Sequence, residues 1–232
     1  MIRAIVTDVE GTTSSLSFVR DTLFPYAKAH LADELRANAG KSEWRAQIEA
    51  VRAELGRSES DNGAELEEVI ETLKGWIDAD RKATPLKTLQ GLIWEAGYRR
   101  GELRAHIYPD VADVMQAWHA QGIALYCYSS GSIHAQRLFF GHCEAGDLTG
   151  LFSGYFDTTT GPKQAAASYT TIASEIGFPP ADILFLSDIE AELDGAIEAG
   201  FAVCQVLREG VTANTRGYAA VPDFEHIDIN DF

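Results

Sequence analysis

The pattern of apolar and polar residues divides the chain into two kinds of sequence. Residues 2–7 form a short, β-branched apolar run, which predicts a first strand that ends at Asp8. Residues 15–106 follow an almost purely helical pattern without a convincing strand, and Pro85 opens the last helix of this stretch. Beyond residue 108 the pattern changes, and helices alternate with strands.

This alternation indicates a parallel sheet covered by helices, because parallel strands need helical crossovers between them. We therefore expect an α/β fold with a doubly wound parallel sheet core, built from residues 1–14 and 107–232. The long helical stretch predicts an inserted all-helical cap domain over residues 15–106. The acidic C-terminal segment, residues 223–232, predicts a solvated and weakly ordered end. The expected helices are 110–122, 132–140, 163–177 and 190–200, and the expected strands are 123–130, 183–188 and 202–207.

The composition is that of a globular protein. The chain has 232 residues, 46% of them hydrophobic, which suffices for one large core or one core and a small second lobe. No apolar run approaches the roughly 20 residues that span a bilayer, and the first residues do not read as a secretory signal. The three cysteines form no CxxC pair and predict buried free thiols, which fit a reducing cytoplasm.

The formal net charge of −16 argues against nucleic acid as a partner, because binding nucleic acid needs a basic surface. It does not exclude an anionic substrate. A local metal ion or a helix terminus can hold an anion on a protein of any net charge.

Polar residues gather where the expected strands end. Ligand sites in doubly wound sheets lie beyond the carboxyl ends of the strands, so we expect these residues to face one crevice. The groups are Asp8-Val9-Glu10-Gly11-Thr12-Thr13, Ser129-Ser130-Gly131-Ser132, Gly161-Pro162-Lys163 before a helix, and Ser187-Asp188 with Glu190 and Glu192 nearby.

These residue types suit phosphoryl transfer. A carboxylate such as Asp8 can attack phosphorus, and Glu10 can protonate the leaving oxygen and then activate water. Asp8, Glu10 and Asp188 bring about three negative charges beside a phosphate, which Lys163 alone does not balance. A hard dication with oxygen ligands does, so we expect magnesium at this site. Ser129 offers further hydrogen-bond donors to the phosphoryl oxygens.

Four segments carry a resemblance to a known family. DVEGTT at 8–13, YSSGS at 128–132, GPK at 161–163 and LSDIEAE at 186–192 resemble the four ordered motifs of the haloacid dehalogenase (HAD) superfamily. Glu10 stands where HAD phosphatases usually have aspartate, and DVEGTT resembles the start of the enolase-phosphatases of methionine salvage. Residues 89–111 and 128–140 also look like that family, so the resemblance covers nearly the whole chain.

The resemblance implies a HAD-like core with a helical cap, one magnesium ion per chain, a cytoplasmic location and a monomer. The implied substrate is a small phosphorylated diketone, which is enolised and then dephosphorylated to an acireductone. It also implies residue roles. Asp8 would be the nucleophile and a metal ligand, Glu10 the acid/base and a ligand through its backbone carbonyl, and Asp188 a second carboxylate ligand. Ser129 and Ser130 would bind substrate and Lys163 phosphate, with Glu192 nearby and without a direct role.

Each of these residues also has a purely structural interpretation. Asp8 can form a turn, Glu10 can be a solvated turn residue, and Ser129-Ser130 or Asp188 can cap the following helix. Lys163 can be an ordinary solvated lysine. Only the ordered set favours function. Trp94 and Tyr98, four residues apart, predict core packing rather than a substrate pocket.

Other functions remain open from the sequence. Another HAD phosphatase or a mutase acting on a small phosphorylated metabolite would be expected to have aspartate at position 10. A haloacid dehalogenase would not need a metal, and a phosphonate hydrolase would use a cap lysine. A non-catalytic binding module on the same core would be expected to lack one of the four motifs, and all four are present.

Overall fold

The computed structural model describes residues 1–56, 64–79 and 81–232, which divide into two compact units. The α/β unit comprises Met1–Leu16 and Arg104–Phe232, and the helical unit comprises Ser17–Leu103. The segment expected to be a cap, residues 15–106, contains the whole helical unit. That this unit acts as a cap stays a prediction.

The α/β unit is built on a six-stranded sheet in the order β3-β2-β1-β4-β5-β6, and all neighbouring strands are parallel. This confirms the predicted fold class. The chain adds strands on one side of β1 and then on the other, so the winding reverses beside β1 and opens a crevice at the carboxyl ends there. The strands are β1 (Ala4–Thr7), β2 (Ala124–Tyr128), β3 (Phe152–Phe156), β4 (Ile183–Ser187), β5 (Ala202–Val206) and β6 (Ala219–Val221).

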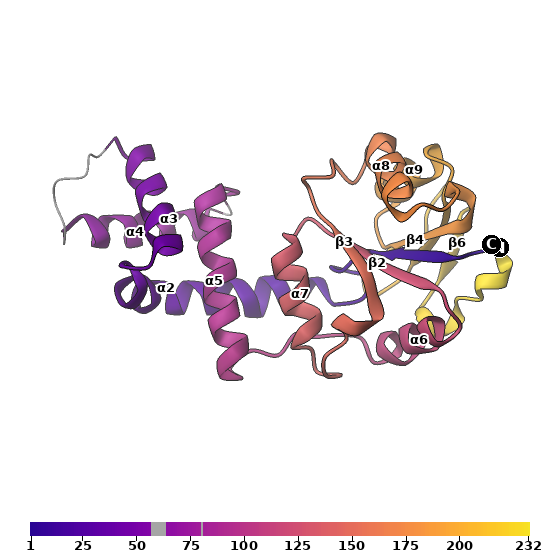
Figure 1. Cartoon of the computed structure of the whole chain (residues 1–232), viewed down its shortest axis with the longest axis horizontal. Coiled ribbons are helices and arrows are strands. Elements are labelled where there is room, and N and C mark those ends of the chain that lie inside the picture. Colours follow the sequence, from indigo (N-terminus) through magenta and orange to yellow (C-terminus); the bar gives the residue numbers. More distant parts are fainter. Residues whose placement is uncertain (57–63, 80) are drawn as a thin grey trace. The chain divides into compact units, whose positions relative to one another are not determined.

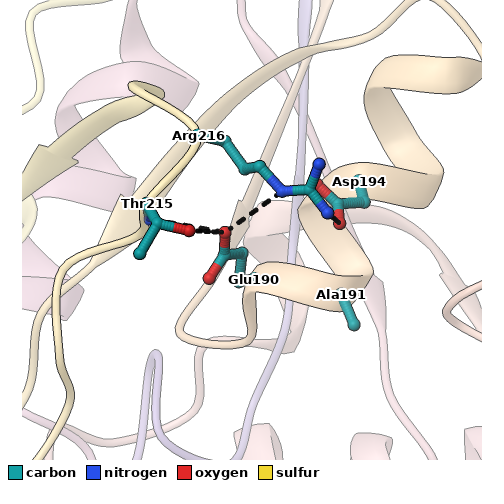
Figure 2. Close-up of a pocket in the computed structure, with 5 residues that line it drawn as sticks. All are labelled: Glu190, Ala191, Asp194, Thr215 and Arg216. Carbon is teal, nitrogen blue, oxygen red and sulfur yellow. Dashed lines mark hydrogen bonds and ion pairs between the residues drawn. The ribbon is translucent and has the colours of Figure 1, made fainter.

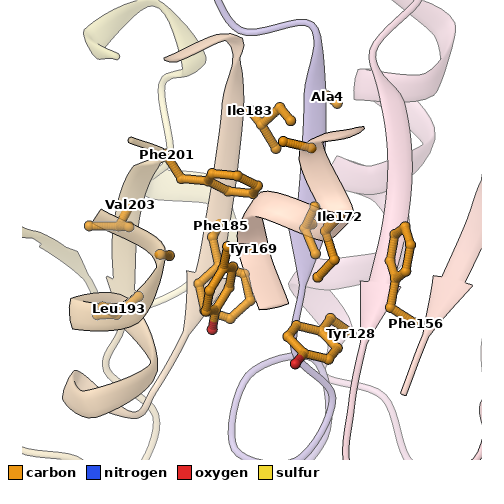
Figure 3. Packing of buried hydrophobic residues seen from close by; sticks show 13 residues of the cluster. Ala4, Tyr128, Phe156, Tyr169, Ile172, Ile183, Phe185, Leu193, Phe201 and Val203 are labelled. Carbon is orange, nitrogen blue, oxygen red and sulfur yellow. The ribbon is translucent and has the colours of Figure 1, made fainter. Parts of the chain in front are cut away.

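Helices cover both faces of the sheet. α8 and α9 lie on one face and α6 on the other (Figure 1). Beneath α8 and α9, buried side chains form a core with Tyr169 among them (Figure 3). The Tyr169 ring meets Tyr128, Phe185 and Phe201 edge-on, at centroid distances of 5.7, 5.0 and 5.6 Å. The helices are α6 (Pro109–Ala120), α7 (Ile133–Gly141), α8 (Ala166–Ile176) and α9 (Glu190–Glu198).

The two edge strands, β3 and β6, were not expected from the sequence. An edge strand has one neighbour and partly exposed side chains, so it lacks the continuous apolar run of a central strand. β6 has only three residues, two of them exposed. In β3, Gly154 lies where a Cβ atom would come within 3.1 Å of the Tyr126 ring.

The prediction of a weakly ordered C-terminal segment is wrong. Phe224 is fully buried, and its ring lies 5.6 Å from that of Trp118. Two 3₁₀ turns, Phe224–His226 and Ile229–Asp231, are capped by the carboxylates of Asp223 and Asp228. Two of the four acidic residues that suggested a solvated tail, Asp223 and Asp228, therefore act as turn caps.

The helical unit has its own apolar core. The first helix leading into it starts earlier than expected, at Leu16, the last residue of the first α/β segment, rather than near Pro25, and it contains a π-turn over Val19–Leu23. Because Pro25 has no N–H and its ring crowds the preceding turn, a widened turn before it is a natural accommodation. The helices are α1 (Leu16–Phe18), α2 (Phe24–Asn38), α3 (Ser42–Glu54), α4 (Ala64–Asp78) and α5 (Thr84–Arg100).

Trp94 and Tyr98 on α5 pack as expected. The indole Nε1 of Trp94 donates to the Leu23 carbonyl at 2.9 Å, and Tyr98 is buried. The three cysteines are likewise buried free thiols. Among the described residues, no helix combines the length and the apolar character needed to cross a membrane.

We predict that Phe224→Ala lowers the free energy of unfolding by about 3 kcal/mol, because it leaves a cavity beside Trp118. Urea denaturation measures the loss. Glu225→Ala, in the same turn but exposed, is the matched control and should change stability by less than about 0.5 kcal/mol. Equal stabilities of the two variants would contradict the packing of the C-terminal segment against Trp118 through Phe224.

Candidate active site

Asp8 begins the loop that follows the central strand. Its N–H donates to the Leu186 carbonyl at 2.9 Å, which extends the β1–β4 ladder by one bond, and its side chain is buried. The residues that follow, here called the 8–14 loop, turn back tightly. The N–H groups of Thr12, Thr13 and Ser14 all point at the Val9 carbonyl, at 3.3, 3.0 and 2.9 Å.

The 8–14 loop fits closely against Asp188. Gly11 has a φ of +84°, and a Cβ atom there would lie 2.3 Å from Asp188 Oδ2. The Thr12 hydroxyl accepts the Asp188 N–H at 3.1 Å. Glycine at position 11 is therefore required by both the backbone conformation and the space. Glu10 is half-buried, and its backbone bridges to that of Ser14.

Lys163 lies at the centre of the buried charges. Its Nζ is 2.5 Å from Asp8 Oδ1 and 2.7 Å from Glu192 Oε2, and only 8% of the side chain is exposed. The interpretation of Lys163 as a solvated lysine is therefore wrong. Glu192 also accepts a hydrogen bond from the Ser187 hydroxyl at 2.9 Å. The sequence suggested no direct role for Glu192, yet it holds Lys163.

The turn that carries Lys163 is fixed from two sides. Lys163 precedes α8 by three residues, rather than starting the helix, and its carbonyl accepts the Tyr169 hydroxyl at 2.7 Å. On the other side, α9 comes so close at Gly195 that a Cβ atom there would lie 2.8 Å from the Gln164 carbonyl. Tight packing thus aims the lysine at Asp8.

Electrostatics favour an added positive charge. Burial alone would lower the pKa of Lys163, but Asp8 and Glu192 outweigh burial and raise it, so the ammonium stays protonated. Burial, and then the charge of Asp8, raise the pKa of Asp188 to about 7. The same two causes raise the pKa of Glu192. Negative charge exceeds what one lysine neutralises.

The serines after β2 have distinct environments. Ser129 is buried, donates its N–H to the Phe156 carbonyl at 3.2 Å and accepts the Gly131 N–H on its hydroxyl at 3.2 Å. Ser130 is exposed. Ser132, not either of these, caps α7 by accepting the Ala135 N–H at 3.2 Å. The helix-cap interpretation of Ser129-Ser130 is wrong, and their contact with substrate stays a prediction.

The helix-cap interpretation of Asp188 is also wrong. The N-cap residue of α9 is Ile189, which makes no side-chain cap hydrogen bond. The Ile189 N–H is instead satisfied by the Ser187 hydroxyl at 3.1 Å. The Asp188 carboxylate is thereby left to face the 8–14 loop.

Two supporting residues escaped sequence reasoning. Gln205, in the apolar strand β5, donates Nε2 to the Asp188 carbonyl at 3.0 Å and to the Thr212 carbonyl at 3.1 Å. Arg208, just beyond the same strand, donates Nε to the Thr12 carbonyl at 3.0 Å. A polar residue inside an apolar strand and a charge at its carboxyl end were the available signals.

Residues of α9 and of the segment 215–216 line an open depression of about 580 Å³ (Figure 2). Glu190 accepts the Thr215 hydroxyl at 3.1 Å, and Arg216 pairs with Glu190 at 3.4 Å and with Asp194 at 3.2 Å. None of the predicted catalytic residues lines it. These contacts fasten the segment to α9.

Comparison with known proteins decides the family. The model of the haloacid dehalogenase-like hydrolases matches residues 2–200. The enolase-phosphatase E1 of Azotobacter vinelandii is 56% identical over 98% of this chain and 97% of its own length. That of Pseudomonas savastanoi pv. phaseolicola is 54% identical over 100% and 99%. The chain belongs to the enolase-phosphatases, within the haloacid dehalogenase-like hydrolases.

A solved structure shares the fold of this enolase-phosphatase. The UTR4 protein of Saccharomyces cerevisiae is 30% identical to this chain, with a TM-score of 0.82 over 98% of this chain and 100% of that one. The likeness therefore extends over both units of the molecule.

Enolase-phosphatases generally use Mg²⁺, and the residues here fit one. Asp8 and Asp188 offer two carboxylates, and Glu10 offers a backbone carbonyl in the same loop as Asp8. Within residues 1–56, 64–79 and 81–232, no group of three His, Cys, Asp or Glu side chains is placed to bind a metal. Magnesium commonly takes only one or two carboxylates, with waters and substrate phosphate completing its shell. The negative charge of the carboxylates that Lys163 does not neutralise would attract the Mg²⁺ ion to this site.

We predict that Asp188→Asn stabilises the metal-free protein, increasingly so as pH rises. The folded pKa of Asp188, about 7, lies above its value in the unfolded chain. The free energy of unfolding of the wild type therefore falls as pH rises from about 4 to 7, and this residue changes it no further above pH 7. Asparagine does not ionise, so the advantage of the variant should grow across this window to roughly 4 kcal/mol.

Urea denaturation in EDTA at several pH values measures this difference. Asp113→Asn removes an exposed carboxylate from α6 and is the control, with an effect below about 0.5 kcal/mol at each pH. A difference for Asp188→Asn that does not change with pH would contradict the electrostatic account.

Proposed function

We propose that this chain converts 2,3-diketo-5-methylthiopentyl-1-phosphate into the acireductone 1,2-dihydroxy-3-keto-5-methylthiopentene and phosphate, in methionine salvage. Relatives named enolase-phosphatase E1, more than 50% identical over nearly the whole chain, support this substrate. The observation that carries the chemistry is the buried ammonium of Lys163, 2.5 Å from the carboxylate of Asp8.

Asp8 is proposed as the nucleophile. One carboxylate oxygen attacks phosphorus, the bond between phosphorus and the leaving oxygen breaks, and an aspartyl phosphate forms. Lys163 orients Asp8 by binding Oδ1 and offsets charge on the phosphoryl group. Glu10 gives its proton to the leaving oxygen. Ser129 and Ser130 are proposed to hold the substrate.

Hydrolysis of the aspartyl phosphate uses the same groups. The Glu10 carboxylate, having lost its proton, accepts one from water while the water oxygen attacks phosphorus. The bond between phosphorus and the Asp8 oxygen breaks, inorganic phosphate leaves, and both carboxyl groups return to their starting states.

Enolisation precedes phosphate release. A proton leaves carbon 1 of the diketone and a proton is added to the oxygen on carbon 2, so the step is an isomerisation without oxidation or reduction. We propose that Glu10 enters this step as a carboxylate, accepts the proton from carbon 1 and delivers it to the oxygen on carbon 2, and then takes up a proton from solvent before phosphoryl transfer. Its carboxyl is one methylene longer than the aspartate usual in HAD phosphatases and reaches further from the 8–14 loop.

One magnesium ion per chain is proposed, held by Asp8, Asp188 and the Glu10 carbonyl, where it would neutralise charge on the phosphoryl oxygens. Lys163 remains the phosphate ligand from the protein. We further propose a cytoplasmic monomer, in keeping with the buried free thiols and a substrate of small size.

The test of this function is turnover of the diketo phosphate by the purified protein. We predict that it releases phosphate and acireductone in equal amounts. A phosphate assay measures the first product, and the ultraviolet absorbance of the enediol measures the second. Asp8→Asn, of equal shape and without a nucleophile, should remain folded and inactive.

Metal removal provides a second arm of the same test. Dialysis against EDTA should abolish turnover, magnesium should restore it, and calcium should restore it poorly because its larger, looser shell disturbs the in-line geometry. Turnover of sugar phosphates but not of the diketo phosphate would support a different HAD phosphatase or mutase. Full activity without metal would favour dehalogenase-like chemistry.

We predict that Glu10→Asp lowers kcat/KM for the diketo phosphate far more than for p-nitrophenyl phosphate. Proton transfer needs heavy atoms about 2.6–3.2 Å apart, and the shorter side chain withdraws the carboxyl by one methylene. The nitrophenolate leaving group barely needs an acid, and the backbone carbonyl is unchanged. If both substrates lose activity in the same proportion, the extra methylene has no substrate-specific role.

A further inference from the structure

Arg208 is a buried cation outside the predicted catalytic residues, and all three nitrogens of its guanidinium donate hydrogen bonds. The side chain is 7% exposed, and its partner Asp110 is 12% exposed. The guanidinium donates NH1 and NH2 to the two Asp110 oxygens at 3.0 and 2.8 Å, and Nε to the Thr12 carbonyl at 3.0 Å. Such a two-pronged pair adds geometric definition to its charge.

The same cluster includes the C-terminal segment. Asp110 Oδ2 also accepts the Phe224 N–H at 2.8 Å. The guanidinium carbon lies 4.0 Å from the centre of the Tyr108 ring and 5.5 Å from that of Phe224. Three distant parts of the chain, namely the 8–14 loop, the first turn of α6 and the C-terminal segment, therefore meet at Arg208.

The contact with Thr12 matters because of what Thr12 touches. Thr12 is fully buried and its hydroxyl accepts the Asp188 N–H. Next to it, Gly11 has no room for a Cβ atom against Asp188. The Thr12 carbonyl that Arg208 binds therefore belongs to the residue that spaces the 8–14 loop from Asp188, although Arg208 itself touches neither the Asp8 nor the Asp188 carboxylate.

We propose that Arg208 is a positioning residue for this reaction: with Asp110, it fixes the Thr12 carbonyl and so holds the 8–14 loop in register with Asp188 for magnesium and phosphate. The inference rests on the proposed function, because it assumes that this loop and Asp188 form the metal and phosphate site. A lysine at position 208 keeps the charge near Asp110, but its donors sit on one nitrogen and lack the rigid fork that binds both Asp110 oxygens and the Thr12 carbonyl together.

The experiment compares Arg208→Lys with two controls. Arg216→Lys changes an exposed arginine that is also paired with two carboxylates and touches nothing in the 8–14 loop. Ile172→Val slightly destabilises the core of the same unit and shows what a loss of stability alone does. All proteins are assayed where circular dichroism shows them folded, with p-nitrophenyl phosphate and with the diketo phosphate.

We expect Arg208→Lys to lower kcat about 10-fold or more and to weaken binding of magnesium alone, measured by calorimetry, by a similar factor. KM should change by less than about threefold, since the loss lies in alignment rather than in substrate contact. Both controls should stay within about twofold of wild type in kcat and magnesium affinity. If Arg208→Lys does not fold, Asp110→Asn, which keeps the shape and loses the charge, should show the same pattern.

The outcomes separate this inference from the proposed function. An active wild type with an unchanged Arg208→Lys, or with a loss equal to that of Ile172→Val, overturns the positioning role alone. A wild type that cleaves p-nitrophenyl phosphate but not the diketo phosphate overturns the proposed substrate and leaves the comparison of variants valid. A wild type that neither binds magnesium nor cleaves either ester overturns both.

Discussion

The site depends on one electrostatic constraint: three carboxylates, Asp8, Asp188 and Glu192, are buried around a single ammonium group. Lys163 touches two of them at 2.5 and 2.7 Å. Burial, and then the charge of Asp8, raise the pKa of Asp188 to about 7. Burying unbalanced charge costs stability, because low-dielectric surroundings solvate it poorly. The fold accepts that cost at the place where we propose that a cation and a phosphate bind, as functional sites commonly do.

Such a cluster persists only because the backbone leaves it little room to relax. The approach of the 8–14 loop to Asp188 and that of α9 to the Lys163 turn both occur at glycines, Gly11 and Gly195, with no space for a Cβ atom. Tyr169 then joins the Lys163 turn to the aromatic core through its hydroxyl. The packing of uncharged groups thus fixes the positions of the charged side chains, so the geometry of the site depends on the packing of the core.

The central sheet, most helices and the positions of the candidate carboxylates were predictable because each follows from a local pattern. Asp8 and Asp188 end apolar runs, and the winding rule for parallel sheets brings such ends together. Arg208 was not predictable, since its partners Thr12 and Asp110 lie 196 and 98 residues away. The edge strands and the burial of Phe224 were not predicted for a related reason. Their burial depends on residues distant in the sequence, and local hydropathy does not record such neighbours.

The proposed two-step reaction makes different demands on this charge balance. Phosphoryl transfer brings an anion to the carboxylates, and enolisation develops negative charge on a carbonyl oxygen. The surplus of buried negative charge, which opposes ionisation of Asp188, also opposes both of these steps. One dication bound at this site would compensate that charge in either step. What distinguishes the steps is the proton, which moves at carbon in one and to a leaving oxygen in the other. A longer acid at position 10 therefore extends proton transfer without adding a further charge to the site.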